Sequence, residues 1–367
     1  MNTIYEINTV NVQPDLDVMQ VKQNSPVVEV FSALTEGRDP NVSDKVKDKA
    51  VQHIAEISEK ALNQDPAAIS ELNAIIRFSI QPKLLSAIRL FNFMGSYRQI
   101  GYHEAPMMKT YKYESIDARF QASSGDVPFA AYSFREYPIG TQTISSGFAV
   151  DYRELQSGNF DGTVAQGMEQ VKIDMQNKAV YYVIKTLFNA IKNAKGVKHY
   201  SEGHGITKTS VDNLMKTMRR YGKVNICGDY SVVSQFNDFS GYKTVGDKTI
   251  SFGAEPVAEE IRKTGLVSFY NGAYITELPN AINWTKLNKD GTDYDLYMPQ
   301  GLLFLIPQGA VSPLQVFLRG GMTSMTGDDV VTRQRLTRFD MELGAGVAEG
   351  MEDQIGLISD LNFEMPA

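Results

Sequence analysis

The chain has 367 residues, a formal net charge of −7, and ordinary shares of apolar (43%) and charged (22%) residues. This composition predicts a globular protein of two or three folding units with a sizeable core. The negative charge means that nothing global attracts nucleic acid or anionic lipid. No stretch approaches 18 apolar residues, and the N-terminus lacks the pattern of a secretory signal, so we expect no membrane contact.

The single cysteine, Cys227, excludes an intramolecular disulfide and fits synthesis in a reducing compartment. It lies in the run 224–228, which is typical of a buried strand. We therefore interpret it as a small packed side chain, with a reactive thiol as the alternative.

The first part of the chain predicts an arm followed by helices. Residues 1–40 show no sustained period and are expected to be an extended or partly ordered arm. A helix is predicted from Ser43, which would act as N-cap, because apolar residues recur on one face. Asp65-Pro66 predicts a second helix start, with Asp as the cap and Pro in the first turn, and helical character is expected as far as Phe93.

Residues 110–152 predict a long two-stranded excursion. The segment is rich in aromatic and β-branched residues, and its turn is marked by residues 123–126. A lone pair of strands is barely stable in water, and exposed apolar surface usually marks an interaction site. We therefore predict contacts with other copies of the chain through Tyr111, Tyr113, Phe129, Tyr132, Phe134 and Tyr137.

The clearest predicted element is a single long helix. Apolar residues recur at steps of mostly three and four from Val164 to Ile191, which indicates one helix of about 30 residues and roughly 45 Å, ending before Gly196.

Residues 205–312 predict a compact α/β lobe. We expect helices from Ser210, from Asp229 and from Glu255 to Gly265. The expected strands are the Cys227 run, 249–252, 266–270, 273–277, 293–298 and 302–306. Three further strands are expected at 314–318, 330–343 and 354–358.

The search for chemistry favours structural interpretations. The run 344–350 has the wrong glycine spacing for a dinucleotide loop. His199, Glu202 and His204 lie in a Gly-rich connection, so a solvated loop is favoured over a metal site. Residues 288–295 predict a tight turn rather than a calcium loop. Asp328-Asp329 lacks a partner nucleophile. We therefore expect no catalytic residue, no cofactor and no metal.

Arg333, Arg335 and Arg338 form a basic stretch near the C-terminus. Arg333 and Arg335 would share one face of a strand. We favour a solvated face or inter-subunit ion pairs through Arg333 and Arg335, with contact to nucleic-acid phosphate as the alternative.

The order of parts resembles the Hong Kong 97-type major capsid protein of tailed bacteriophages. The pattern is carried by residues 144–155, 255–261, 272–275, 298–307 and 312–314. The resemblance implies an α+β fold with an N-terminal arm and helices (1–105), an extended β-hairpin loop (106–152), a peripheral domain with a spine helix (153–204 and 313–367) and an axial domain (205–312).

The resemblance further implies a structural, non-enzymatic major head protein. Its copies would assemble through pentamers and hexamers into an icosahedral shell around double-stranded DNA. Scaffolding, portal or decoration proteins are implied partners, and the implied location is the virion after synthesis in the host cytoplasm. Two alternatives stay open: an encapsulin-like nanocompartment shell, and an intracellular α/β enzyme with a polar pocket in residues 205–312.

Overall fold

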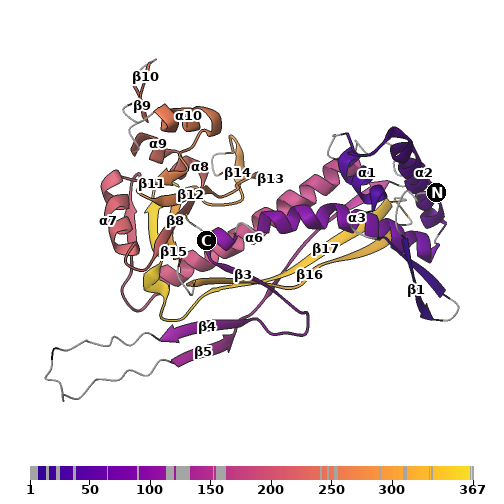
Figure 1. Cartoon of the computed structure of the whole chain (residues 1–367), viewed down its shortest axis with the longest axis horizontal. Helices are drawn as coiled ribbons and strands as arrows, with labels where there is room; N and C mark the ends of the chain where they lie inside the picture. The colour runs from indigo at the N-terminus through magenta and orange to yellow at the C-terminus, as the bar shows by residue number, and fades with distance from the viewer. Residues whose placement is uncertain are drawn as a thin grey trace. The chain divides into compact units, whose positions relative to one another are not determined.

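The computed structural model describes residues 7–13, 16–21, 25–35, 39–63, 65–88, 91–112, 120, 133–151, 153, 163–239, 242–245, 248–251, 255–288, 291–308, 312–329, 331, 334–363 and 365. The fold class is α+β, as predicted (Figure 1). The chain divides into two compact units. Unit 1 contains 1–89, 143–179 and 321–342, and unit 2 contains 90–142, 180–320 and 343–367.

Unit 1 begins with a hairpin and three helices rather than an extended arm. Residues expected to be extended form helix α1, which buries Val27, Val30 and Phe31. The prediction was wrong because α1 is short and apolar on most of its surface, so it shows no polar face to reveal a helical period. The elements are β1 (Ile7–Gln13), β2 (Leu16–Val21), α1 (Pro26–Thr35), α2 (Asp44–Leu62) and α3 (Pro66–Ile88).

The two predicted helices are confirmed, with differences at their ends. Ser43 occupies the N-cap position of α2, but its side chain makes no capping hydrogen bond. Asp65 does cap α3, because its Oδ1 accepts the backbone amide of Ala67 at 3.0 Å, and Pro66 is the first helical residue. Helix α3 ends at Ile88, and a separate short helix, α4 (Phe91–Met94), follows in unit 2.

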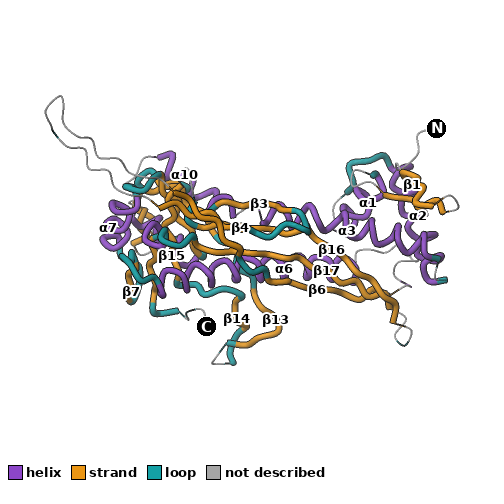
Figure 2. Tube along the Cα trace, turned by 90° about the horizontal axis from the view of Figure 1, so that it is seen from below, coloured by secondary structure: helices purple, strands orange, loops and turns teal. Residues whose placement is uncertain are grey.

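The predicted long helix is α6 (Thr163–Asn193), with 31 residues. Its apolar stripe is buried, including Met175 and Leu187. Unit 1 also holds most of β6 (Gln142–Asp151), with the later part of β16 (Leu314–Asp329) and the first part of β17 (Gln334–Val347). In unit 1 these strands lie in the order β16-β17-β6 (Figure 2).

Unit 2 is built on a six-stranded sheet in the order β11-β12-β8-β15-β18-β7. Its central strand β15 (Leu302–Gln308) is buried at every residue but the last, as its continuous apolar run dictates for a strand covered on both faces. Val211, Met215, Val233 and Phe236 from the lobe's helices pack with Leu303 and Leu305 in one core.

Two strands of this sheet come from ranges expected in the spine domain, β7 (Tyr200–Gly203) and β18 (Gly356–Asp360). The six-stranded sheet therefore includes strands from outside the predicted 205–312 lobe. Sequence periodicity shows that a strand exists but not which strands it joins, so the partners of these two short segments were missed.

Capping in this lobe follows the predicted chemistry with one shift. Thr207, not Ser210, is the N-cap of α7 (Lys208–Met218), and its hydroxyl accepts the amide of Ser210 at 3.2 Å. Asp229 caps α8 (Tyr230–Val233) as expected. Gly265 ends α10 (Glu255–Thr264) with a φ of +78°, which glycine adopts without strain.

The remaining elements of unit 2 include strands that were not predicted, β3 and β13, and strands shorter than predicted, β11 and β14. Their bounds are β3 (Ser96–Ile100), β4 (Met107–Lys112), β5 (Ser133–Pro138), β8 (Lys223–Gly228), α9 (Gln235–Phe239), β9 (Tyr242–Val245), β10 (Lys248–Ser251), β11 (Phe269–Tyr270), β12 (Ala273–Glu277), β13 (Ile282–Leu287), β14 (Tyr294–Leu296) and a 3₁₀ turn, Glu352–Gln354.

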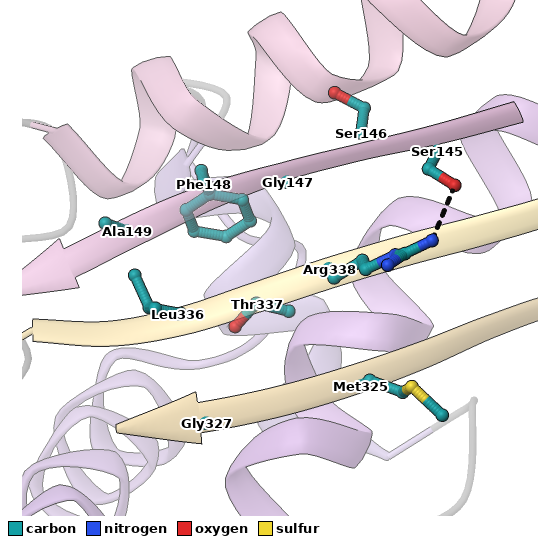
Figure 3. Close-up of a pocket in the computed structure, with 10 residues that line it drawn as sticks. All are labelled: Ser145, Ser146, Gly147, Phe148, Ala149, Met325, Gly327, Leu336, Thr337 and Arg338. Atoms are coloured by element: carbon teal, nitrogen blue, oxygen red, sulfur yellow. Dashed lines mark hydrogen bonds between the residues drawn. The ribbon is translucent and has the colours of Figure 1, made fainter. Parts of the chain in front are cut away.

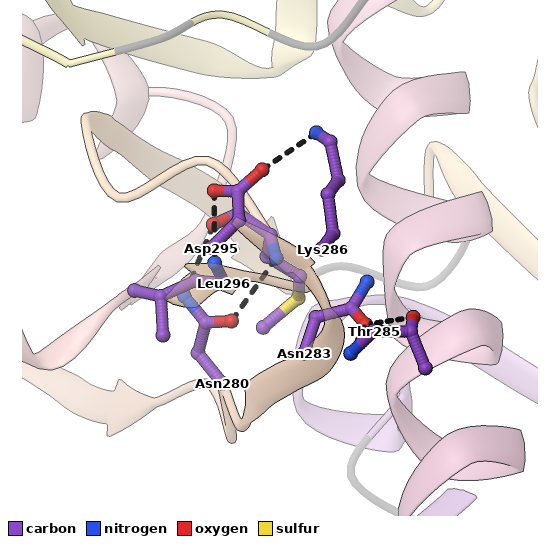
Figure 4. A network of polar contacts seen from close by, with 7 residues as sticks. Asn280, Asn283, Thr285, Lys286, Asp295 and Leu296 are labelled. Atoms are coloured by element: carbon purple, nitrogen blue, oxygen red, sulfur yellow. Dashed lines mark hydrogen bonds and ion pairs between the residues drawn. The ribbon is translucent and has the colours of Figure 1, made fainter. Parts of the chain in front are cut away.

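The hairpin β13–β14 is stabilised by local polar contacts (Figure 4). Lys286 pairs with Asp295 at 2.5 Å, and Thr285 donates to Asn283 at 2.6 Å. At the turn, the side chain of Asn288 accepts the amide of Thr292, and Gly291 has a φ of +66°. The described residues of 288–295 thus confirm the predicted turn.

Candidate assembly surface

The predicted excursion is a hairpin of β4 and β5, paired antiparallel with Met108 opposite Tyr137 and Lys112 opposite Ser133. It ends earlier than expected, because β6, although inside the predicted 106–152 range, belongs to a different sheet. The alternating pattern continues through residues 142–151, so sequence periodicity alone could not separate the second hairpin strand from the strand after it.

The base of this hairpin is built into its own chain. Met108 is 1% exposed and packs with Ala348 and Met351, while Tyr137 and Ile139 lie against the same cluster. Gly346 lies beside the end of the Met108 side chain. The base of the hairpin therefore has a burial site in its own chain.

Polar contacts hold the base at the same place. The Thr110 hydroxyl donates to the carbonyl of Glu349 at 2.5 Å, and the amide of Glu349 donates to the Tyr137 hydroxyl oxygen at 3.0 Å. The Tyr137 hydroxyl in turn donates to Met108 Sδ at 3.1 Å. Burial raises the pKa of Tyr137, and the nearby carboxylates of Glu349 and Glu352 raise it further, so the phenol keeps its proton.

The predicted contact residues divide between this base and the rest of the hairpin. Tyr137 is half-buried in the base, whereas Phe134 is 62% exposed. The backbone of Tyr111 lies in β4 opposite Phe134, and nothing is described of its side chain. Tyr113, Phe129 and Tyr132 lie outside the described residues. Among the predicted contact residues whose side chains are described, Phe134 is mostly exposed and Tyr137 is not.

A second surface lies within unit 1, a shallow groove of about 610 Å³ along β6, β16 and β17 (Figure 3). Exposed Met325 and Leu336 line it, together with Gly147 and Gly327. Arg338 borders it and donates to Ser145 at 3.1 Å and to Asp340 at 2.8 Å. No sequence motif indicated this groove.

Arg335 does not lie on a solvated face, as was expected for the basic stretch. Arg335 is 1% exposed, and its guanidinium donates a hydrogen bond to Asn73 at 2.7 Å. The side chain of Arg335 therefore lies in the interior of unit 1. Arg338 points to the opposite, exposed side of β17, as strand alternation requires. Arg333 lies outside the described residues. A basic residue in a strand pattern gives no sign that its side chain is buried, so the place of Arg335 could not be predicted.

The segments that were considered as cofactor, metal or thiol sites take part in ordinary structural contacts. Gly344 to Val347 belong to strand β17, and the turn follows at Ala348 to Met351. His204 bonds Asn362 at 3.1 Å. Cys227 is fully buried, and that burial raises the pKa of its thiol to about 12. Within the described ranges, no cluster of three or more His, Cys, Asp or Glu could hold a metal ion, and no helix is long and apolar enough to cross a bilayer.

The described elements run in the order of N-terminal helices, hairpin, long helix, α/β lobe and returning strands. A family model described as "SPbeta prophage-derived putative capsid protein YonB" matches residues 8–359. The chain therefore belongs to this family of capsid proteins, and the predicted class of structural head protein is confirmed. No curated protein matches the chain.

Several solved structures are similar to the chain. The capsid of cyanophage P-SCSP1u is 12% identical with a TM-score of 0.46, covering 73% of this chain and 87% of that one. The mature capsid of bacteriophage PhiM1 is 11% identical with a TM-score of 0.46, covering 75% and 87%. An encapsulin complex from Synechococcus elongatus is 11% identical with a TM-score of 0.43, covering 77% and 88%.

Proposed function

We propose that this chain is a shell-forming subunit whose copies assemble, through pentamers and hexamers, into an icosahedral head around double-stranded DNA. Its role is structural and not catalytic, and its place is the virion, after synthesis in the host cytoplasm. Membership of a capsid protein family supports the proposal. Closed shells need heterologous contacts that close, and many weak contacts per subunit add to a stable particle.

One observation carries the proposed mode of assembly. The hairpin base is fixed in its own chain, whereas Phe134, only three residues from Tyr137, is 62% exposed. A strand pair with one end anchored and a large, mostly exposed apolar side chain is suited to burying more of that side chain against another copy. We extend this role to Tyr111, Tyr113, Phe129 and Tyr132 along the same segment.

The proposal is tested by expressing the chain alone and with the proteins encoded beside it, then examining the product by electron microscopy. We expect closed particles from the wild type, and at least tenfold fewer from Phe134→Ser with unchanged thermal stability. Phe269→Ser removes a comparably exposed aromatic ring, at 55%, away from the hairpin and is the matched control. Wild-type chains that stay monomeric in both settings would contradict the proposal.

The content of the particles decides which kind of shell this is. Nuclease-protected duplex DNA of uniform length would support a phage head. Particles that instead retain one co-purified protein and no nucleic acid would favour the encapsulin-like alternative over DNA packaging.

A further inference from the structure

Gln315 makes a contact that no sequence pattern indicated. It is the second residue of β16, and its side chain is almost fully buried, at 3% exposure. Its Oε1 accepts the backbone amide of Lys109 at 3.1 Å, and its Nε2 donates to the backbone carbonyl of Lys109 at 2.6 Å. One side-chain amide therefore satisfies both backbone groups of a single residue in the hairpin.

The pairing of β4 with β5 explains why Lys109 has these groups available. In an antiparallel pair, alternate residues direct their amide and carbonyl away from the partner strand. Both backbone groups of Lys109 bond Gln315, so Lys109 and Glu136 form a non-hydrogen-bonded pair, which their side chains bridge at 2.8 Å. The backbone of Lys109 thus faces the open edge of the hairpin.

A glutamine amide offers the same donor and acceptor as a peptide group. The Gln315 side chain therefore makes the two hydrogen bonds with Lys109 that a residue of a neighbouring strand would make at this edge of the hairpin. We call this pair of hydrogen bonds the rung. This rung lies between the Met108 packing contact and the Thr110 hydrogen bond, close to where the hairpin passes from its anchored base to the exposed side chain of Phe134.

We infer that Gln315 is a positioning residue for assembly. Its side-chain amide fixes the base of the β4–β5 hairpin and so sets the direction of the hairpin relative to the rest of unit 2. The part of the inference that concerns assembly rests on the proposed function. The part that concerns the rung does not, since it can be measured in the unassembled chain.

The first test is amide hydrogen exchange of the unassembled chain. Gln315→Met keeps the length of the side chain and removes both hydrogen-bonding groups. We expect the Lys109 amide to exchange at least tenfold faster, because its acceptor is gone. Asn225→Leu is the matched control: Asn225 is also 3% exposed, and its amide donates to the Phe93 carbonyl at 2.9 Å, away from the hairpin. It should leave Lys109 exchange within twofold of wild type.

A second variant covers the case in which Gln315→Met does not fold. Gln315→Asn retains the amide but withdraws it by about 1.5 Å, too far to bond both groups of Lys109. The same acceleration of Lys109 exchange is expected. Unchanged exchange in whichever variant folds would overturn the inference.

The second test compares particles. Gln315→Met should give fewer or misshapen particles, whereas Asn225→Leu, at a similar loss of thermal stability, should give wild-type ones. Normal particles from a variant with fast Lys109 exchange would refute the positioning role and leave the proposed function intact. A wild-type chain that forms no particles would contradict the proposed function, while the exchange experiment would still decide whether the rung exists.

Discussion

The guanidinium of Arg335 donates a hydrogen bond to Asn73 Oδ1 across 2.7 Å, at a place where the arginine is 1% exposed. The contact joins strand β17 to helix α3, two elements separated by 262 residues in the sequence. A buried charge is tolerated only when its donors find acceptors. This arginine therefore belongs to the interior of unit 1 and is not available to phosphate groups.

Arg335→Met should lower the free energy of unfolding by about 1–3 kcal/mol, because Asn73 loses a charge-assisted hydrogen bond in a buried place. Arg338→Met is the control in the same strand. Its side chain is 61% exposed beside Asp340, so the change should stay within about 0.5 kcal/mol. Denaturant titration measures both, and equal losses would contradict the assignment of Arg335 to the interior.

Tyr137→Phe should destabilise the chain by about 0.5–1.5 kcal/mol, because the amide of Glu349 loses its acceptor at the hairpin base. Tyr230→Phe, at a hydroxyl-bearing ring that is half exposed, should change stability by less than half as much. Thermal unfolding followed by circular dichroism provides the comparison. A Tyr137→Phe chain as stable as wild type would show that this hydrogen bond does not anchor the base.

Gly147→Ala should destabilise unit 1 by about 1–3 kcal/mol. A Cβ at this position in β6 would meet the carbonyl oxygen of Thr337 at 2.7 Å, and backbone cannot move aside as a flexible side chain can. Gly140→Ala meets nothing within 4 Å and serves as the control. Chemical denaturation should separate the two variants, and equal stabilities would mean that β6 and β17 do not approach this closely.

Alkaline pH should unfold the chain partly through Cys227. Burial raises the pKa of its thiol from 9.0 to about 12, so the folded state holds the proton more tightly than the unfolded state. The contribution of this thiol to the free energy of unfolding is fully present below pH 9. It is lost as the pH rises toward 12, by roughly 4 kcal/mol in total. Denaturant titration at pH 8 and pH 11 should show a smaller loss for Cys227→Ala than for wild type.

A thiol reagent provides the complementary measurement. Wild-type Cys227 should remain unmodified at pH 8 until denaturant unfolds the lobe, because the thiolate cannot form in its buried site. Rapid modification of the folded chain would contradict the buried strand that contains it.

Long or strongly patterned elements could be predicted from the sequence. Helix α6 follows from its apolar steps, and β12 and β15 follow from short apolar runs with turn residues at their ends. Asp229 and Gly265 mark helix ends through side-chain capping and left-handed backbone, which are local effects. Such features depend on residues that are near one another in the chain, so they can be predicted from the sequence alone.

The contacts that shape the candidate surface could not be predicted in the same way. Gln315 and Lys109 are 206 residues apart, and a buried glutamine in an apolar strand gives no local sign of its partner. The burial of Arg335 depends on helix α3, which the alternation of β17 does not reveal. Phe134 was predicted as a contact residue because aromatic residues in a lone strand pair form a local sequence pattern. The contacts that anchor the base of the hairpin give no such pattern.

The position of β15 inside its sheet has a consequence for the newly made chain. Strand β18, which pairs with one side of β15, is synthesised only after β16 and β17. Throughout that interval an apolar strand presents an open edge to the surrounding cell, the arrangement that most readily recruits other unfinished chains. A chain truncated before β18 would therefore keep this edge of β15 unpaired and should aggregate more readily than the full chain.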